Sequence, residues 1–516
     1  MEHRSQSGKQ KLPRGSAAGQ CGRRLQGASA DAFLLAAVKM MTVVLGFVVT
    51  RLLSQYLSKY DYGTYSKVVL IFSAISSLTI LGMMDGVNYF YCSTRDPQRQ
   101  EQYLATMFVL QILVSAVAGS LVMVLSGPIC AYLDHDDAKR LLLFVAALPF
   151  LQNILSMTQV LIVTIGKARL LAARNLVVSV VRLTAVVLAL KFVRTVWAVL
   201  LITVALDVGQ IVLFLVILRR SGCRFRFRYM RLELAKPILR YTIPMAVSVV
   251  LSEWNRNCDK YIVTLFTDTQ TLAVYTNASK PLPFDLIQTS FTTVLLPAMT
   301  RLIARGRKRE VVSLYQSFLE IVYTSTVVLG CAALSVSPQL MRLLYTEKYL
   351  AGLSVFVIYI LVDMIKFTNI TLLLSASGRT KQLMALAVGA LAANLALNLA
   401  LFHLLGLIGP AIATLVVTLG TGILMLHVAA KGLGAGVTAF FDLRYLARLA
   451  AQSAAAVAVF CFVRTGLEQL NLPYLAVMIL TGGACFLALM ALNGKRFVRN
   501  LRQVNQMSRA IVNQEG

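Results

Sequence analysis

Charged residues are scarce in this sequence. Only 14% of its 516 residues are Asp, Glu, Lys or Arg, whereas a soluble domain has about a quarter. Hydrophobic residues make up 58% of the chain, and the mean hydropathy is +0.72. The shortage of charge excludes an ordinary soluble protein and predicts a membrane protein.

Acidic residues are scarcer than basic residues. The chain has 22 of them against 50 basic residues, which gives a formal net charge of +28. A nucleic-acid-binding protein gathers such an excess on one face of a soluble fold. Here the basic residues fall between long apolar runs, so the charge pattern does not indicate nucleic-acid binding.

The residues that enzymes and metal sites need are also sparse. The eight cysteines include no C-x-x-C pair, and the four histidines are widely separated. The sequence contains no G-x-x-x-x-G-K-[ST] motif, so it encodes no ATP-driven pump. The loops between the apolar runs are too short to hold a catalytic domain. We therefore expect no disulfide framework, no zinc site and no bound cofactor. We also expect that the protein is not an enzyme.

Long apolar runs dominate the rest of the chain. A helix needs about 20 apolar residues to cross a bilayer, and fourteen runs meet this length. They predict an all-α polytopic membrane protein with 14 transmembrane helices. The expected spans are 31–52, 68–91, 104–126, 141–164, 172–190, 195–218, 241–265, 271–298, 311–335, 351–376, 383–404, 407–429, 446–464 and 473–493.

The basic residues predict the orientation. Short loops rich in Lys and Arg stay in the cytoplasm. If the N-terminus is cytoplasmic, 34 of the 50 basic residues lie in or within three residues of the cytoplasmic segments, against nine for the opposite loops. We therefore expect a multi-pass protein of the cytoplasmic membrane with both termini in the cytoplasm.

A basic segment divides the chain. Residues 219–240 contain eight Lys and Arg residues and predict a cytoplasmic linker whose cations contact anionic membrane lipids. The expected parts are a basic tail (1–30), a six-helix lobe (31–218), the linker, a second six-helix lobe (241–429), two additional helices (446–493) and a tail (494–516).

A faint internal repeat supports this division. The segments 62–66 (YGTYS) and 272–276 (LAVYT) both place a small residue and a Tyr-Ser/Thr pair where the second helix of a hairpin begins. Six spans repeated in the same orientation would give two lobes that face each other across a central cavity.

Charges inside the spans mark the candidate site, because an ionisable side chain in a membrane is costly and by default functional. Cations from both lobes suit an anionic ligand, since ammonium and guanidinium groups donate to phosphate oxygens. The alternative is that these charges pair across helices and only hold the lobes together. Two pairs, Glu253 with Arg256 and Asp363 with Lys366, lie three residues apart and can also neutralise each other on one helix face. The candidate substrate-binding residues are Lys39, Asn88, Arg182, Arg256, Asn257 and Lys280.

Prolines interrupt the seventh and eighth spans. Pro244, Pro281, Pro283 and Pro297 each remove a backbone donor. We expect both spans to be bent, and such bends can act as hinges.

Three passages carry a resemblance to a known family. They are 57–66, which ends in Tyr-Gly-Thr-Tyr-Ser; 257–260 (NCDK), followed by 273–275 (AVY) and 296–297 (LP); and 377–381 (SGRTK), followed by Asn394, Asn398 and 409–411 (GPA). In their order and spacing the sequence resembles the bacterial polysaccharide flippases of the multidrug/oligosaccharidyl-lipid/polysaccharide exporter superfamily.

The resemblance implies a flippase that moves a lipid-linked (polyprenyl diphosphate) oligosaccharide across the cytoplasmic membrane by alternating access. It implies that the cations contact phosphate or acidic sugars. In-span acids equal in-span bases, so either Asp85, Glu253 and Asp285 couple transport to H⁺ or Na⁺, or the substrate is less anionic. Further partners would be the glycosyltransferases and polymerase of the same pathway.

Other functions stay open. A multidrug antiporter of the same superfamily usually has twelve spans and an acidic cavity, which this sequence lacks. A lipid II or sporulation-type flippase would share the fold, and no residue excludes it. A non-transporting scaffold for envelope enzymes would tolerate neutralisation of the charged group.

Overall fold

The computed structural model describes residues 38–94, 96–165, 167–220, 227–369, 371–377 and 380–513. These residues form helices, turns and loops, and none of them lies in a strand. The chain is an all-α, multi-pass membrane protein. Twelve stretches of the described residues are helical, long enough and apolar enough to cross a membrane. One of them, Lys381–Leu433, contains two helices, and Thr269–Ala304 is not among the twelve, so fourteen crossings are compatible with this arrangement.

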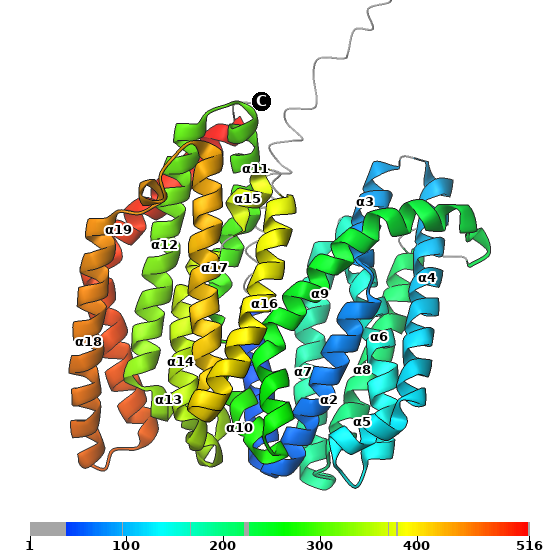
Figure 1. The fold of residues 1–516 in the computed structure, drawn as a ribbon, viewed down its shortest axis with the longest axis horizontal. Coiled ribbons are helices and arrows are strands. Elements are labelled where there is room, and N and C mark those ends of the chain that lie inside the picture. Colours follow the sequence, from blue (N-terminus) through cyan, green and yellow to red (C-terminus); the bar gives the residue numbers. More distant parts are fainter. Residues whose placement is uncertain are drawn as a thin grey trace, which may run out of the picture.

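Two groups of helices lie side by side in Figure 1. We call them the first and second bundles. The first begins with the helix Val38–Tyr56. Its other helices are α2 (Lys59–Thr79), α3 (Met83–Ser93), α4 (Pro97–Val124), α5 (Ser126–Leu133), α6 (Ala138–Thr164), α7 (Ala168–Phe192) and α8 (Val196–Arg220).

The second bundle follows two short 3-10 turns, η1 (Phe227–Tyr229) and η2 (Leu232–Leu234). Its elements are α9 (Ala235–Phe266), α10 (Thr269–Ala278), η3 (Pro283–Asp285), α11 (Leu286–Ala304), α12 (Lys308–Ser335), α13 (Ser337–Tyr345), η4 (Glu347–Gly352), α14 (Leu353–Ile365), η5 (Lys366–Asn369), α15 (Leu372–Ala376), α16 (Thr380–Leu405), η6 (Gly406–Ile408), α17 (Gly409–Leu433), η7 (Val437–Phe440), α18 (Leu443–Gln469) and α19 (Tyr474–Asn513).

Side-chain caps fix several helix starts. At the start of α2 the Ser58 side chain accepts a hydrogen bond from the backbone N–H of Asp61. At the start of α4 the side chain of Asp96, the residue before Pro97, accepts one from the backbone N–H of Gln98. Asp268 and Asp442 cap α10 and α18 in the same way. Each cap satisfies a backbone donor that the first helical turn leaves free.

Several predicted spans are broken helices. The span expected at 68–91 divides into α2 and α3 at Leu81 and Gly82, which both have positive φ values, +47° and +62°. The span expected at 271–298 divides into α10 and α11 around Pro281 and Pro283. Pro244 lies inside α9, which remains one helix of 32 residues. The segment at 281–283 therefore ends a helix, whereas Pro244 does not.

The α9 helix, which we count with the second bundle by its place in the chain, also packs on α2 and α3 of the first bundle (Figure 1). Near its start, Gly82 lies against Thr242 and Ala246. Near its end, the Tyr261 hydroxyl donates to the carbonyl of Leu70 at 3.4 Å, and Phe266 stacks on Phe402 of α16. The start of this helix thus packs on the first bundle, and its C-terminal part connects the two bundles.

The bundles meet at one end, which we call the hairpin end and define by the segments 51–58, 267–269 and 342–352. Lys348 Nζ donates to the carbonyls of Gln55 and Leu57, at 3.0 and 3.1 Å. Arg51 Nη1 donates to the carbonyl of Arg342 at 2.9 Å. A hydrophobic cluster with Tyr62 and Tyr345 spans both bundles there. The ribbons diverge toward the opposite, linker end, which bears η1 and η2 (Figure 1).

The helices that carry the two segments of the predicted repeat, α2 and α10, pack on each other at the hairpin end. Gly63 of α2 lies so close to α10 that a Cβ atom would overlap the carbonyl oxygen of Thr269. A backbone oxygen within a helix start cannot turn away as a side chain can. Only glycine fits this contact without a shift of one helix.

We expect Gly63→Ala to lower the free energy of unfolding by about 1–3 kcal/mol, the usual cost of overpacking a tight contact. Denaturant unfolding of the detergent-solubilised protein measures it. Gly46→Ala is the matched control, because nothing lies within 4 Å of a Cβ atom there. Equal stability of the two variants would contradict the close approach of α2 and α10.

Candidate functional site

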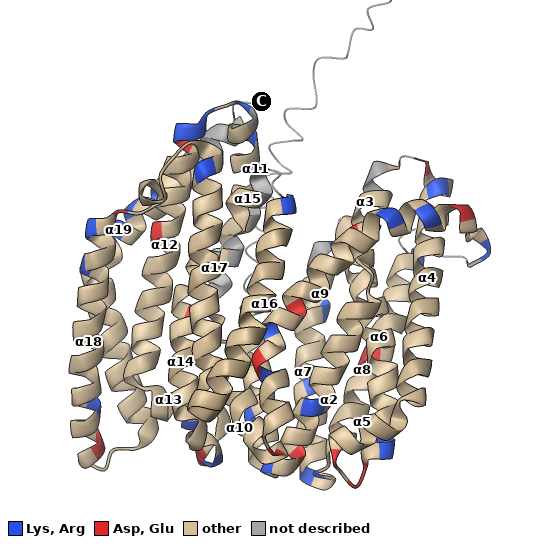
Figure 2. Ribbon diagram, in the orientation of Figure 1, with Lys and Arg blue, Asp and Glu red and all other residues tan. Residues whose placement is uncertain are grey.

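Most Lys, Arg, Asp and Glu residues lie toward the ends of the helices (Figure 2). A few lie inside, and α9 carries a stripe of polar side chains at positions 253, 256, 257 and 260. This spacing of three and four places them on one helix face. Arg256 Nη2 lies 3.3 Å from Glu253 Oε2. Asn257 Nδ2 donates to Glu253 Oε1 at 2.8 Å, and Lys260 Nζ donates to Asn257 Oδ1 at 3.2 Å.

Arg256 is paired with Glu253 within its own helix but remains accessible. The Arg256 side chain is 69% exposed, so most of its donors stay free for a ligand. The carboxylate of Glu253 is 21% exposed. The structure therefore brings the predicted residues Glu253, Arg256 and Asn257 together.

Lys280 lies between the bundles, in the connection after α10. Its Nζ donates to Thr50 Oγ1 of the first helix at 2.5 Å and lies 5.5 Å from the centre of the Phe47 ring. Among the described residues it has no carboxylate partner. Lys280 is thus a predicted cation whose charge no described acid neutralises.

The break before α11 is stabilised by Asp363 of α14. Its Oδ2 accepts a hydrogen bond from the backbone N–H of Leu282 at 2.7 Å, and its Oδ1 accepts one from Lys366 Nζ at 2.5 Å. The carboxylate thus satisfies a donor that the proline-containing segment leaves free. The sequence indicates the Asp363–Lys366 pair by its spacing of three but not its bond to Leu282.

Arg182 of α7 faces Asp207 of α8. Their closest atoms, Nη2 and Oδ1, are 3.8 Å apart, and the Arg182 side chain is 39% exposed while that of Asp207 is fully buried. Gln152 and Gln210 donate to the same carboxylate, Gln210 at 3.2 Å. Asp207 is therefore held by amide donors as well as by Arg182.

The other predicted residues lie on elements other than α9. Lys39 is exposed near the start of the first helix, and Asp85 is exposed in the first turn of α3. Asn88, also exposed, accepts a hydrogen bond from Thr164 at 3.4 Å. The side chain of Asp285 lies outside the described residues. Convergence of all these groups on one cavity stays a prediction.

Two buried groups of the site were not predicted. Asp259 of α9 is 2% exposed and accepts a hydrogen bond from the Tyr359 hydroxyl of α14. Arg174, which the hydropathy pattern places at a loop edge, is 8% exposed inside α7. The sequence could have indicated Asp259, because it is an acidic residue on an apolar helix. Nothing in the sequence singles out its partner Tyr359.

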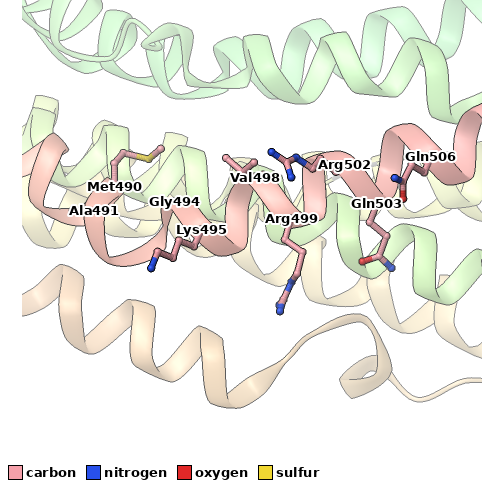
Figure 3. A pocket seen from close by; sticks show the side chains of 9 residues that line it. All are labelled: Met490, Ala491, Gly494, Lys495, Val498, Arg499, Arg502, Gln503 and Gln506. Carbon is pink, nitrogen blue, oxygen red and sulfur yellow. The ribbon is translucent and has the colours of Figure 1, made fainter.

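A groove of about 830 Å³ runs along α19 near the linker end (Figure 3). Lys495, Arg499 and Arg502 line it. Beside the groove α19 is fixed to α12, because Arg496 Nη2 lies 2.8 Å from Glu320 Oε1. Arg496 also bonds Asp442, and this hydrogen bond holds the pKa of the Asp442 carboxyl below its usual range.

The family model of the polysaccharide biosynthesis proteins matches residues 48–353. The chain belongs to this family. The matched region runs from the first helix through η4 and so includes the α9 stripe and Lys280. No curated protein matches the chain.

Solved structures share the fold of this polysaccharide biosynthesis protein. One is the lipid II flippase MurJ in an inward closed conformation, with a TM-score of 0.66 and 17% identity over 90% of this chain and 100% of that chain. A second is a multidrug resistance transporter of the MATE family in an inward-facing conformation, with a TM-score of 0.59 and 13% identity over 78% and 98% of the two chains.

A third is a MOP-superfamily transporter from Pyrococcus furiosus, with a TM-score of 0.53 and 12% identity over 79% and 94% of the two chains. At these identities the likeness shows the fold alone. The family and these structural neighbours are transporters and flippases, not enzymes.

Proposed function

We propose that this protein moves a lipid-linked oligosaccharide with a polyprenyl diphosphate anchor from the cytoplasmic to the outer leaflet, for cell-surface polysaccharide synthesis. Membership of the polysaccharide biosynthesis family carries the proposal. The arrangement of the two bundles supports it, because they contact each other at the hairpin end and their ribbons diverge toward the linker end. Alternating access needs two bodies that can be closed at one end and open at the other.

The cations Arg256 and Lys280 are the candidate contacts for the diphosphate. Arg256 keeps exposed donors, and Lys280 has no described carboxylate partner. In this proposal Lys39, Arg182, Asn88 and Asn257 assist them. Glu253, Asp85 and Asp285 are the candidates for coupling to H⁺ or Na⁺.

A direct test follows lipid-linked oligosaccharide across vesicles that contain the purified protein. We expect translocation by the wild type and a loss of about tenfold or more in the Arg256→Gln/Lys280→Gln variant, because each charge-assisted hydrogen bond contributes about 1.5–3 kcal/mol. Unchanged translocation by this variant would contradict the assigned site. A stable protein without translocation of any lipid-linked sugar would favour the scaffold function.

Two alternatives within the fold have distinct substrates. The likeness to MurJ covers all of that chain and favours a lipid II substrate as the second candidate. A multidrug antiporter is the third. Competition between an oligosaccharide carrier, lipid II and an organic cation in the same vesicles separates them.

The orientation is part of the proposal. With the linker end in the cytoplasm of the cell, both termini are cytoplasmic and α19 leaves the membrane at the inner headgroup layer. Its exposed apolar residues Leu487 and Leu492 are followed at once by Lys495, Arg499 and Arg502. We infer that this groove and the 219–240 linker contact anionic lipids. Glycosyltransferases and a polymerase of the pathway are further proposed partners.

We expect Lys495→Gln/Arg499→Gln/Arg502→Gln to reduce the anionic lipid that copurifies from mixed vesicles, because each basic residue at a membrane surface contributes about 1 kcal/mol. Lipid analysis of the purified protein measures it. Lys139→Gln/Arg140→Gln/Lys191→Gln removes the same charge from exposed positions at the hairpin end and should change little. Equal losses in both variants would contradict a lipid site on α19.

A further inference from the structure

The interface of α7 and α8 contains a buried guanidinium with unused donors. Arg174 is 8% exposed, and its Cζ lies 4.6 Å from the centre of the Phe214 ring. Its Nη1 donates to Asn175 Oδ1 at 2.6 Å. Its Nε and Nη2 are buried and make no hydrogen bond with the described residues. Buried donors without acceptors are costly, so this side chain fits a ligand with oxygen acceptors.

Arg182 adds a second guanidinium two turns along α7. Its Nε is also buried without a described acceptor, and its Nη2 is 3.8 Å from Asp207 Oδ1, too far for a hydrogen bond. Asp207 is the counter-ion of Arg182. Its carboxylate already accepts hydrogen bonds from Gln152 and Gln210. Asp207 lies within Coulombic range of both guanidinium groups, so the cluster of Arg174, Arg182 and Asp207 carries an excess of one positive charge.

We propose that α7 and α8 form a binding site for an oxyanion of the phosphate class. Arg174 supplies the buried donors Nε and Nη2, and the half-exposed Arg182 forms the entrance. Asp207 is the internal counter-ion, which holds the two cations in place when the site is empty. A guanidinium group matches two phosphate oxygens at once, which a single ammonium group does not.

The site adds Arg174 to the residues that recognise substrate and places a phosphate contact inside the first bundle. Its assignment to the diphosphate of a lipid-linked substrate rests on the proposed function. The existence of the oxyanion site does not, because it follows from the three charges and the unused donors.

Calorimetry on the full-length protein in detergent tests the site with two probes, inorganic diphosphate and farnesyl diphosphate. We expect Arg174→Gln to weaken binding about tenfold or more and Arg174→Lys to restore part of it. The control Lys139→Gln, an exposed residue at the hairpin end, should bind like the wild type.

Asp207→Asn gives the sharper result. It keeps the side-chain shape and removes the negative charge that competes with the ligand, so we expect binding to tighten about tenfold. A purely structural pair would not produce a gain in affinity. This outcome also does not depend on whether Arg174→Gln folds.

The site is overturned if neither probe binds, if Arg174→Gln binds like the wild type, or if Asp207→Asn weakens binding. Binding of farnesyl diphosphate alone supports a lipid-linked ligand, whereas equal binding of both probes supports a site for the free oxyanion. Vesicle translocation separates this claim from the proposed function. A wild-type protein that binds diphosphate but moves no lipid contradicts the function and leaves the site standing.

Discussion

Replacement of Lys280 by Met is expected to lower the rate of lipid-linked oligosaccharide translocation by about 10- to 100-fold, with the protein still folded. The ammonium group has no carboxylate partner among the described residues and donates only to Thr50 Oγ1. A charge-assisted hydrogen bond to phosphate contributes about 1.5–3 kcal/mol. Methionine has a similar length and removes a charge that is costly within the membrane, so stability should not fall.

Two variants separate a substrate contact from a structural one. Thr50→Val removes the acceptor of Lys280 but keeps its charge, and we expect it to transport nearly as well as the wild type. Lys191→Met removes an exposed lysine at the hairpin end and serves as the charge control. If Thr50→Val loses as much transport as Lys280→Met, the lysine only joins the bundles. Rates in vesicles and melting temperatures in detergent measure both properties.

Glu320 is expected to be the most important charged residue for stability. It lies in α12 and is 5% exposed. Its carboxylate accepts hydrogen bonds from Arg496 Nε at 3.0 Å and from Arg496 Nη2 at 2.8 Å. Asn500 donates to it at 2.5 Å. Removal of one partner from a buried ion pair costs about 3–5 kcal/mol, so Glu320→Ala should lower the free energy of unfolding by this amount.

The double variant Glu320→Leu/Arg496→Met provides the control. It removes both charges together, and apolar replacement of a buried pair is often close to neutral. Asp442 loses its bond to Arg496 in this variant, but it is 34% exposed and remains hydrated. We therefore expect it to be more stable than Glu320→Ala. Denaturant unfolding of the wild type, Glu320→Leu, Arg496→Met and the double variant completes a mutant cycle and gives the coupling energy. A coupling energy near zero would contradict the pairing of α12 with α19.

The sequence predicts the helices well because spanning segments are long and apolar, and this property is local. It predicts the breaks less well. Pro281 and Pro283 indicate the end of α10, but the break between α2 and α3 depends on left-handed backbone at Leu81 and Gly82. Pro244, which looks like a break, lies inside a continuous α9.

Side-chain partners were predictable only within one helix. The spacing of three links Glu253 to Arg256, and the structure confirms that contact. The pairs Arg182–Asp207 and Glu320–Arg496 join residues that are far apart in the chain. Such pairs follow from how helices pack, which hydropathy does not contain. For the same reason the buried donors of Arg174 could not be expected from the sequence.

The central claim is that the two bundles carry a lipid-linked oligosaccharide across the membrane by way of cations that lie between them. The most direct measurement is translocation of a fluorescent polyprenyl-diphosphate oligosaccharide in vesicles that contain only this protein. We predict protein-dependent transfer to the opposite leaflet, which Lys280→Met reduces and Lys191→Met does not. Equal transfer in protein-free vesicles, or in all three proteins alike, would contradict the account.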